Sequence, residues 1–110
     1  MSDKLTVFVN DESVFEYDRL IELDEQQLAF LDKMDSDMSR GIKVRGEVIA
    51  EPGEEQRAEF VAMNLIKALQ QDNEASVMVC CAYLTQRNSN LLEVRVSDGD
   101  VGVVVAFIVG

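Results

Sequence analysis

Apolar and polar residues alternate at both ends of the chain, and this pattern predicts two β-hairpins. Residues 5–17 carry β-forming residues on both sides of a turn signal at Asn10-Asp11-Glu12. Residues 92–97 alternate as far as Asp98-Gly99, a strong two-residue turn signal. The returning strand, residues 101–109, is apolar on both faces, which is typical of a strand that is central in a sheet or covered on both sides.

Apolar residues spaced three and four positions apart predict two helices in the middle of the chain. The first follows Asp24, which stands three residues before Gln27 as in a capping box. The second follows Pro52-Gly53 and carries a wide apolar face over residues 58–69, which makes it the best candidate for the central core helix. Between them, residues 42–50 are either a short extended segment or an irregular connection.

Residues 77–84 are continuously apolar, so periodicity cannot separate a buried helix from a buried strand. Their flanking residues extend the segment beyond the usual length of a strand, which favours a helix. The predicted order is therefore β-β-α-α-α-β-β. We expect a single α+β domain over residues 1–110, with two layers and with the helices packed on one antiparallel sheet.

The chain is strongly acidic, with ten Lys and Arg against twenty-one Asp and Glu and a net charge of −11. Residues 1–60 carry a balance of −9 and residues 61–110 a balance of −2, so the acidity belongs mainly to the first part. Such a surface repels phosphate backbones and anionic membranes, and we expect neither as a partner. The start of the chain lacks the pattern of a signal peptide, and its apolar runs are far shorter than the roughly 20 residues of a membrane span.

Two adjacent cysteines, Cys80 and Cys81, lie inside the apolar run. Neighbouring cysteines cannot staple distant parts of a chain, so they indicate a reduced, cytoplasmic protein. Redox dithiols usually have the spacing Cys-x-x-Cys and cationic neighbours, and this pair has neither. We expect both thiols to be inert core residues.

The chain contains no histidine, which is the commonest general base, metal ligand and partner of a Ser or Cys nucleophile. Its absence excludes Ser-His-Asp and Cys-His catalytic sites from a single chain. An enzyme that uses carboxylates, Lys or Tyr is not excluded. Glu54 and Glu55 suit the first turn of a helix, and Arg57 and Arg95 are expected to be surface ion-pair partners. We therefore predict no catalytic residue and no cofactor.

One segment has part of the pattern of a calcium-binding EF-hand loop. Asp35, Asp37 and Ser39 fall at its first, third and fifth positions. The sixth position should be Gly but is Arg40, and the twelfth should be Glu but is Gly46. Because the segment also overlaps the first predicted helix, we expect no metal site.

Sparse catalytic equipment and surplus apolar content favour a non-enzymatic protein-interaction module. It would act through a surface, as a homodimer or with an unknown protein partner. One layer of helices covers only one face of a strand such as 101–109, so the other face must be shielded by the N-terminal hairpin, a third layer or another copy of the protein. We favour another copy, which gives a dimer. The alternative is an enzyme or small-molecule binder with a carboxylate/Arg/Tyr site assembled only in three dimensions, from Arg57 and Tyr17 or Tyr83. A third hypothesis is an acidic regulator of a basic, nucleic-acid-binding partner.

Overall fold

A computed structural model describes residues 4–44, 46–99 and 102–110. The elements follow in the order β1 (Lys4–Val9), β2 (Glu12–Asp18), α1 (Glu25–Met38), β3 (Ile42–Val44), β4 (Glu47–Ile49), α2 (Glu54–Gln70), α3 (Glu74–Arg87), β5 (Leu91–Gly99) and β6 (Gly102–Val109). The α+β class and the predicted order are confirmed. The ambiguous run at 77–84 is helical, and the uncertain segment at 42–50 contains a short hairpin, β3–β4.

The larger sheet has four strands in the order β2-β1-β5-β6. Both hairpins pair antiparallel, as predicted, but the central strands β1 and β5 pair parallel, with Val7 opposite Val94. The sheet is therefore mixed rather than antiparallel throughout. The reason is that the chain between β2 and β5 is long enough to bring β5 back beside β1 in the same direction, which a tight turn cannot do.

Strand β6 lies at an edge of this sheet, with β5 as its neighbour. Of the two alternatives that its apolar composition predicts, a central position or cover on both sides, the central position is therefore wrong. Val101, the first residue of the predicted strand, lies outside the described residues. Burial along β6 alternates, with Val103, Val105 and Phe107 half-buried and the residues between them exposed. One face of the strand thus meets the core and the other does not.

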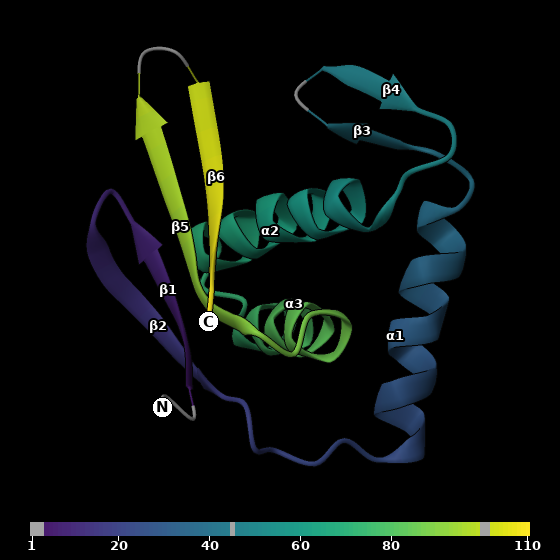
Figure 1. Cartoon of the computed structure of the whole chain (residues 1–110), viewed down its shortest axis with the longest axis horizontal. Helices are drawn as coiled ribbons and strands as arrows, with labels where there is room; N and C mark the ends of the chain where they lie inside the picture. Colours follow the sequence, from purple (N-terminus) through teal and green to yellow (C-terminus); the bar gives the residue numbers. More distant parts are fainter. Residues whose placement is uncertain (1–3, 45, 100–101) are drawn as a thin grey trace.

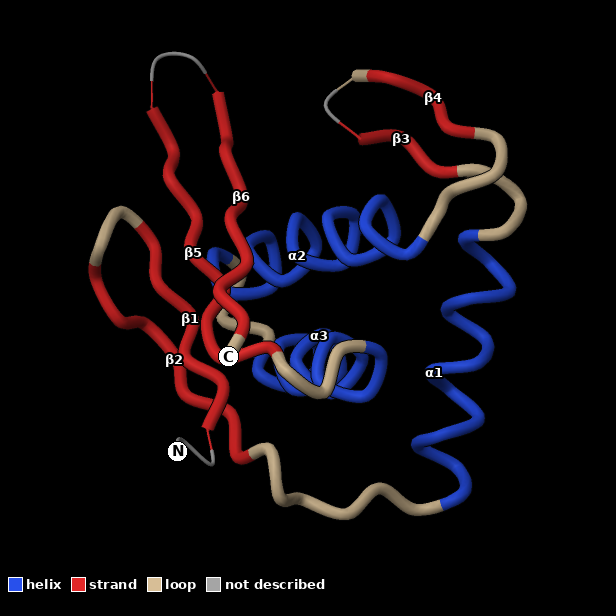
Figure 2. Tube along the Cα trace, viewed as in Figure 1, coloured by secondary structure: helices blue, strands red, loops and turns tan. Residues whose placement is uncertain are grey.

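The three helices lie on one side of the four-stranded sheet (Figures 1 and 2). Helices α2 and α3 run side by side against it, and α1 stands on their far side from β1 and β2 (Figure 1). Leu5 and Val7 of β1, Val94 and Val96 of β5, and Leu65 of α2 are all buried in the core between these layers. None of the helices in the described ranges is long and apolar enough to cross a membrane.

Short polar side chains fix the starts of two helices. Asp24 Oδ1 accepts a hydrogen bond from the backbone N–H of Gln27 at 2.8 Å, and Gln27 Oε1 accepts one from the N–H of Asp24 at 2.9 Å. The predicted capping box is therefore present at the start of α1. At α3, Asn73 Oδ1 accepts from the N–H of Ser76 at 3.2 Å. Each bond satisfies a backbone group that the helix itself leaves without a partner.

Candidate functional site

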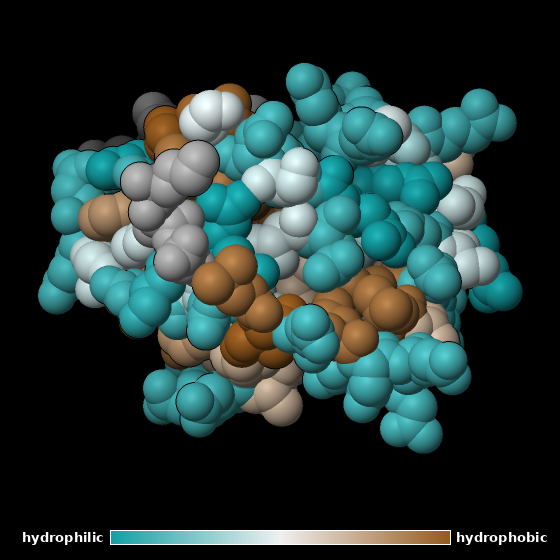
Figure 3. Space-filling view, turned by 60° about the horizontal axis from the view of Figure 1, so that its bottom comes forward, coloured by the Kyte–Doolittle hydropathy of each residue, from teal (hydrophilic) through white to brown (hydrophobic). Residues whose placement is uncertain are grey.

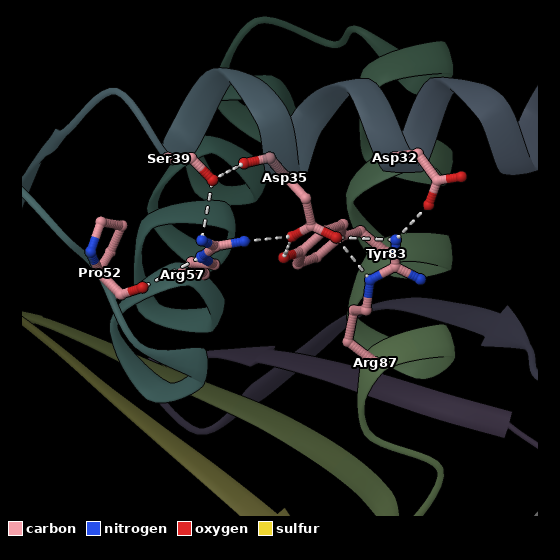
Figure 4. Close-up of polar contacts among 7 residues, drawn as sticks. All are labelled: Asp32, Asp35, Ser39, Pro52, Arg57, Tyr83 and Arg87. Atoms are coloured by element: carbon pink, nitrogen blue, oxygen red, sulfur yellow. Dashed lines mark hydrogen bonds and ion pairs between the residues drawn. The ribbon is translucent and has the colours of Figure 1, made fainter.

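A polar network joins α1 to the other two helices, and it centres on the carboxylate of Asp35 (Figure 4). Arg57 on α2 donates to Oδ1 of Asp35 from Nη1 at 3.1 Å. Arg87 on α3 donates to Oδ2 from Nε at 2.9 Å and lies 2.8 Å from it through Nη2. The hydroxyl of Tyr83, one helical turn before Arg87, donates to Oδ1. A single carboxylate thus receives hydrogen bonds from three side chains on two other helices.

The two guanidinium groups are also held by contacts outside Asp35. Arg57 donates to the Ser39 hydroxyl at 3.0 Å and to the backbone oxygen of Pro52 at 3.2 Å. Arg87 donates to Asp32 at 3.1 Å and lies over the ring of Tyr83, 5.3 Å from its centroid. Each arginine is therefore held in place by several contacts with its own chain.

These contacts move the pKa values of the network away from neutrality. Burial alone would raise the pKa of Asp35, but the hydrogen bonds from Tyr83, Arg87 and Arg57 outweigh it and lower that pKa. Burial and the hydrogen bond to Asp35 raise the pKa of Tyr83 to about 12. Burial opposes the charge of Arg87, but its bonds to Asp35 raise its pKa overall. Asp35 stays ionised and Tyr83 stays protonated near pH 7. Groups with fixed protonation states suit a structural contact between helices better than a role in proton transfer.

A groove of about 900 Å³ opens beside this network. Val105, Phe107 and Val109 of β6 line one side of it, and Ala58 of α2 and Leu84 of α3 belong to its lining as well. The remaining lining residues come from the start of α2, the end of α3 and the start of β5, together with Asp35 (Pro52, Gly53, Glu54, Glu55, Arg57, Glu59, Tyr83, Arg87, Asn88 and Leu91). The groove therefore runs between the edge strand and the ends of the helices.

The outer face of β6 is a second candidate surface. Val104 is 49% exposed and Ile108 39% exposed, and both lie on the face that points away from the helices. The neighbouring positions on β5 are polar, with Ser97 opposite Val104 and Glu93 opposite Ile108. At these two positions the apolar strip therefore ends at β6 and does not continue onto β5.

A third candidate surface lies between α1 and α3. Ile21, Phe30, Met78 and Val79 line a groove of about 450 Å³ there, and Phe30 is exposed. Figure 3, which brings the bottom of Figure 1 forward, shows apolar side chains gathered on that side of the molecule. Tyr17, one of the tyrosines considered for a site, lines this groove rather than the one beside Asp35.

The structure brings together some of the residues that the sequence singled out and separates others. Arg57 and Tyr83 converge with a carboxylate, as the small-molecule hypothesis requires, so Arg57 is not merely a surface ion-pair partner. Arg95 is separate from this cluster. It pairs with Glu93 at 2.8 Å and with Asp11 at 3.6 Å on the face of the sheet that points away from the helices. Its guanidinium also lies 4.2 Å from the centroid of the Phe8 ring.

Sequence reasoning missed the roles of Asp35 and Arg87. The only local signal was the four-residue spacing of Tyr83 and Arg87, which places both on one face of a helix. Asp35 and Ser39, considered for a calcium loop, instead hold arginines at the end of α1. Among the residues that the structure describes, no group of three or more Cys, Asp or Glu is placed to hold a metal ion.

Cys80 and Cys81 are buried and unbonded to each other. Burial raises the pKa of Cys80 to about 11 and, with a contribution from Cys80, the pKa of Cys81 to about 12. Both thiols are therefore protonated near pH 7, which is the form that reacts poorly as a nucleophile.

Comparison with known proteins gives no relative. The chain matches no family model, no curated protein and no solved structure.

Proposed function

We propose that the protein is a non-enzymatic interaction module that forms a homodimer through the outer face of β6. One observation carries the proposal: β6 is apolar on both faces, while the helices cover only one. Val104 and Ile108 on the other face are each more than a third exposed. Soluble proteins often bury such a surplus apolar surface by two-fold self-association.

The distribution of charge supports this contact. The chain carries a net charge of −11, so two copies repel each other over most of their surface. Strand β6 has no charged residue, and a two-fold contact would place the same apolar strip of each copy against the other. Glu93 lies beside the strip, opposite Ile108 on β5, where it pairs with Arg95 at 2.8 Å, and Glu16 lies on β2 at the other edge of the sheet. Self-association there would bury apolar surface with little like-charge contact.

The titratable groups support a non-enzymatic function. General acid–base catalysis is most efficient when the pKa lies near the working pH. The pKa of Asp35 is lowered, and those of Tyr83, Cys80 and Cys81 are raised to about 12, 11 and 12. We further propose a cytoplasmic location, because both thiols are free.

Light scattering after size exclusion tests the dimer. We expect a mass near twice the 12.3 kDa of one chain at micromolar concentration. Val104→Lys combined with Ile108→Lys should shift the mass to that of one chain, because it places lysines inside the contact. Val14→Lys is the matched control, since Val14 is 42% exposed on β2, the opposite edge strand, and should leave the dimer intact. A wild-type protein with the mass of a single chain would refute the proposal.

The groove beside Asp35 favours a second candidate function, the binding of a small molecule. Its volume of about 900 Å³ is that of a typical ligand site, and Arg57 and Tyr83 line it together with a carboxylate. Against this, Arg57 and Tyr83 both donate to the carboxylate of Asp35 itself, so these groups are already partnered inside the protein. A thermal-shift screen with a metabolite library would favour this candidate if a compound stabilised the wild type but not Ala58→Phe, which narrows the groove.

A further inference from the structure

We infer that the groove beside β6 binds an extended segment of a partner protein. The segment would add to the sheet as a fifth strand, and the side chains that it points toward the helices would include both apolar and basic ones. This site uses the backbone edge of β6 and the groove on its helix side. It is therefore separate from the outer face through which the proposed dimer would form.

The first argument is the free edge of β6. Within the described residues, β6 has a strand partner on one side only, along eight residues without a charged side chain. Proteins usually protect a sheet edge with charges, proline or a covering segment. The other edge strand, β2, has such charges in Glu12, Glu16 and Asp18. The two edges therefore differ, and β6 is the one suited to pairing with another chain.

The second argument is the shape of the groove. An added strand would lie about 4.8 Å from β6 and would point every second side chain toward the helices. Those side chains would enter the groove between Phe107 on β6 and Ala58 and Leu84 on the helices. Asp35 of α1 also lines the groove, so a chain lying in it would run between β6 and the helices. A second copy would offer its own β6, which carries no basic residue, to a groove that Glu54 and Glu55 line.

The third argument is charge, which selects a basic partner. The charged residues that line the groove comprise four carboxylates and two guanidiniums and carry a net charge of −2 (Asp35, Glu54, Glu55, Glu59, Arg57 and Arg87). Both guanidiniums are already paired with Asp35, so much of their charge is compensated before any partner arrives. Glu54 and Glu55 are exposed at the start of α2. Lysine or arginine side chains on a bound segment would meet these two carboxylates.

Fluorescence anisotropy with two labelled peptides tests the inference. Both peptides match the eight residues of β6 in length. At the four alternate positions that face the groove, one peptide carries valine and lysine in turn and the other carries valine and glutamate in turn, and both carry threonine at the four positions between. We expect the lysine peptide to bind, with an affinity that falls as salt rises, and the glutamate peptide not to bind. Equal binding of the two peptides, or binding of neither, would overturn the inference.

A pair of double variants separates the groove from the general acidity of the protein. Glu54→Gln with Glu55→Gln should weaken binding of the lysine peptide by about fivefold or more at low salt. Glu12→Gln with Glu22→Gln removes the same charge outside the groove and should weaken it by less than about twofold. An equal loss in both double variants would mean that the peptide binds the acidic surface without using this site, and would contradict the proposal.

Amide hydrogen exchange locates the bound peptide. We expect the backbone N–H groups of β6 that point away from β5 to become protected when the lysine peptide is present. Protection confined to α1 and α3, beside Phe30, would assign the peptide to the other groove and overturn the inference. Repeating the measurement with Val104→Lys and Ile108→Lys keeps the two proposals distinct, because this variant removes the dimer contact and leaves the groove unchanged.

Discussion

At the scale of single residues, Asp35 is the side chain whose polar contacts join all three helices. Its partners lie 22, 48 and 52 positions away in the sequence, at Arg57, Tyr83 and Arg87. No local pattern can reveal such a cluster, because it exists only once three helices have packed. Sequence analysis identified Arg57 and Tyr83 by residue type alone and assigned Asp35 to a calcium-loop pattern. The carboxylate at the centre was therefore not predicted.

Replacing Asp35 by alanine should destabilise the protein by about 1–3 kcal/mol, because two arginines lose a shared carboxylate that is only 26% exposed. Asp32→Ala is the matched control on the same helix. Asp32 also pairs with Arg87 but is 79% exposed, so its loss should cost less than about 1 kcal/mol. Urea melts measure both values. Similar costs would show that Asp35 is no more than a surface ion-pair partner.

Cys80 and Cys81 should label slowly with a thiol reagent in the native protein and completely in denaturant. Their raised pKa values keep both thiols protonated, and burial hides them from the reagent. An Ellman-type assay at pH 7.5 provides the measurement. Fast labelling of the folded protein would reopen a redox function for the pair.

At the scale of helices and strands, the reliable predictions were those that rest on short-range chemistry. The start of α1 follows from Asp24 and Gln27, which lie three residues apart and bond as predicted. The helical state of 77–84 followed from segment length. The parallel pairing of β1 with β5 and the edge position of β6 did not follow, because neighbours within a sheet depend on the path of the whole chain. The apolar composition of a strand shows that its side chains need to be shielded from water, but it does not show which part of the molecule shields them.

The contributions of α1 and α2 to the free energy of unfolding can be compared by substituting one residue at the start of α1 and one in α2. Asp24→Ala removes the acceptor for the Gln27 N–H and should cost about 1 kcal/mol. Leu65→Ala leaves a cavity at a fully buried position of α2 and should cost about 2–5 kcal/mol. Denaturant melts of the two variants give the ranking. The reverse order would mean that α2 is not the central core helix.

At the scale of the whole molecule, stability should depend on pH at both extremes. The pKa of Asp35 is lower in the folded protein, so its contribution is complete above about pH 4 to 5 and is lost as the pH falls through the folded value. The pKa of Tyr83 is raised from 10.0 to about 12, so its contribution is complete below pH 10 and is lost between these values. The pKa values of Cys80 and Cys81 are also raised, from 9.0, so their contributions to stability are likewise lost as the pH rises above 9.0.

Urea melts between pH 3 and 11 should therefore give a plateau from about pH 5 to pH 8, with a decline on either side. Asp35→Asn should make the acid decline shallower, because it removes the group that must be protonated there. Tyr83→Phe should reduce the alkaline decline but not abolish it, since the cysteines remain. An acid limb of the same slope in Asp35→Asn and in the wild type would contradict the role given to Asp35.

The parallel pair at the centre of the sheet also bears on how the chain folds during synthesis. Val7 meets Val94, 87 positions later, so this contact closes a very long loop. On the ribosome, β1 and β2 leave the exit tunnel well before β5 is made, and β1 must wait with one side unpaired. Proteins with such distant pairings fold slowly compared with helical bundles of similar size. The nascent hairpin therefore leaves the side chains of Leu5 and Val7, which are fully buried in the folded protein, uncovered until the later elements are made.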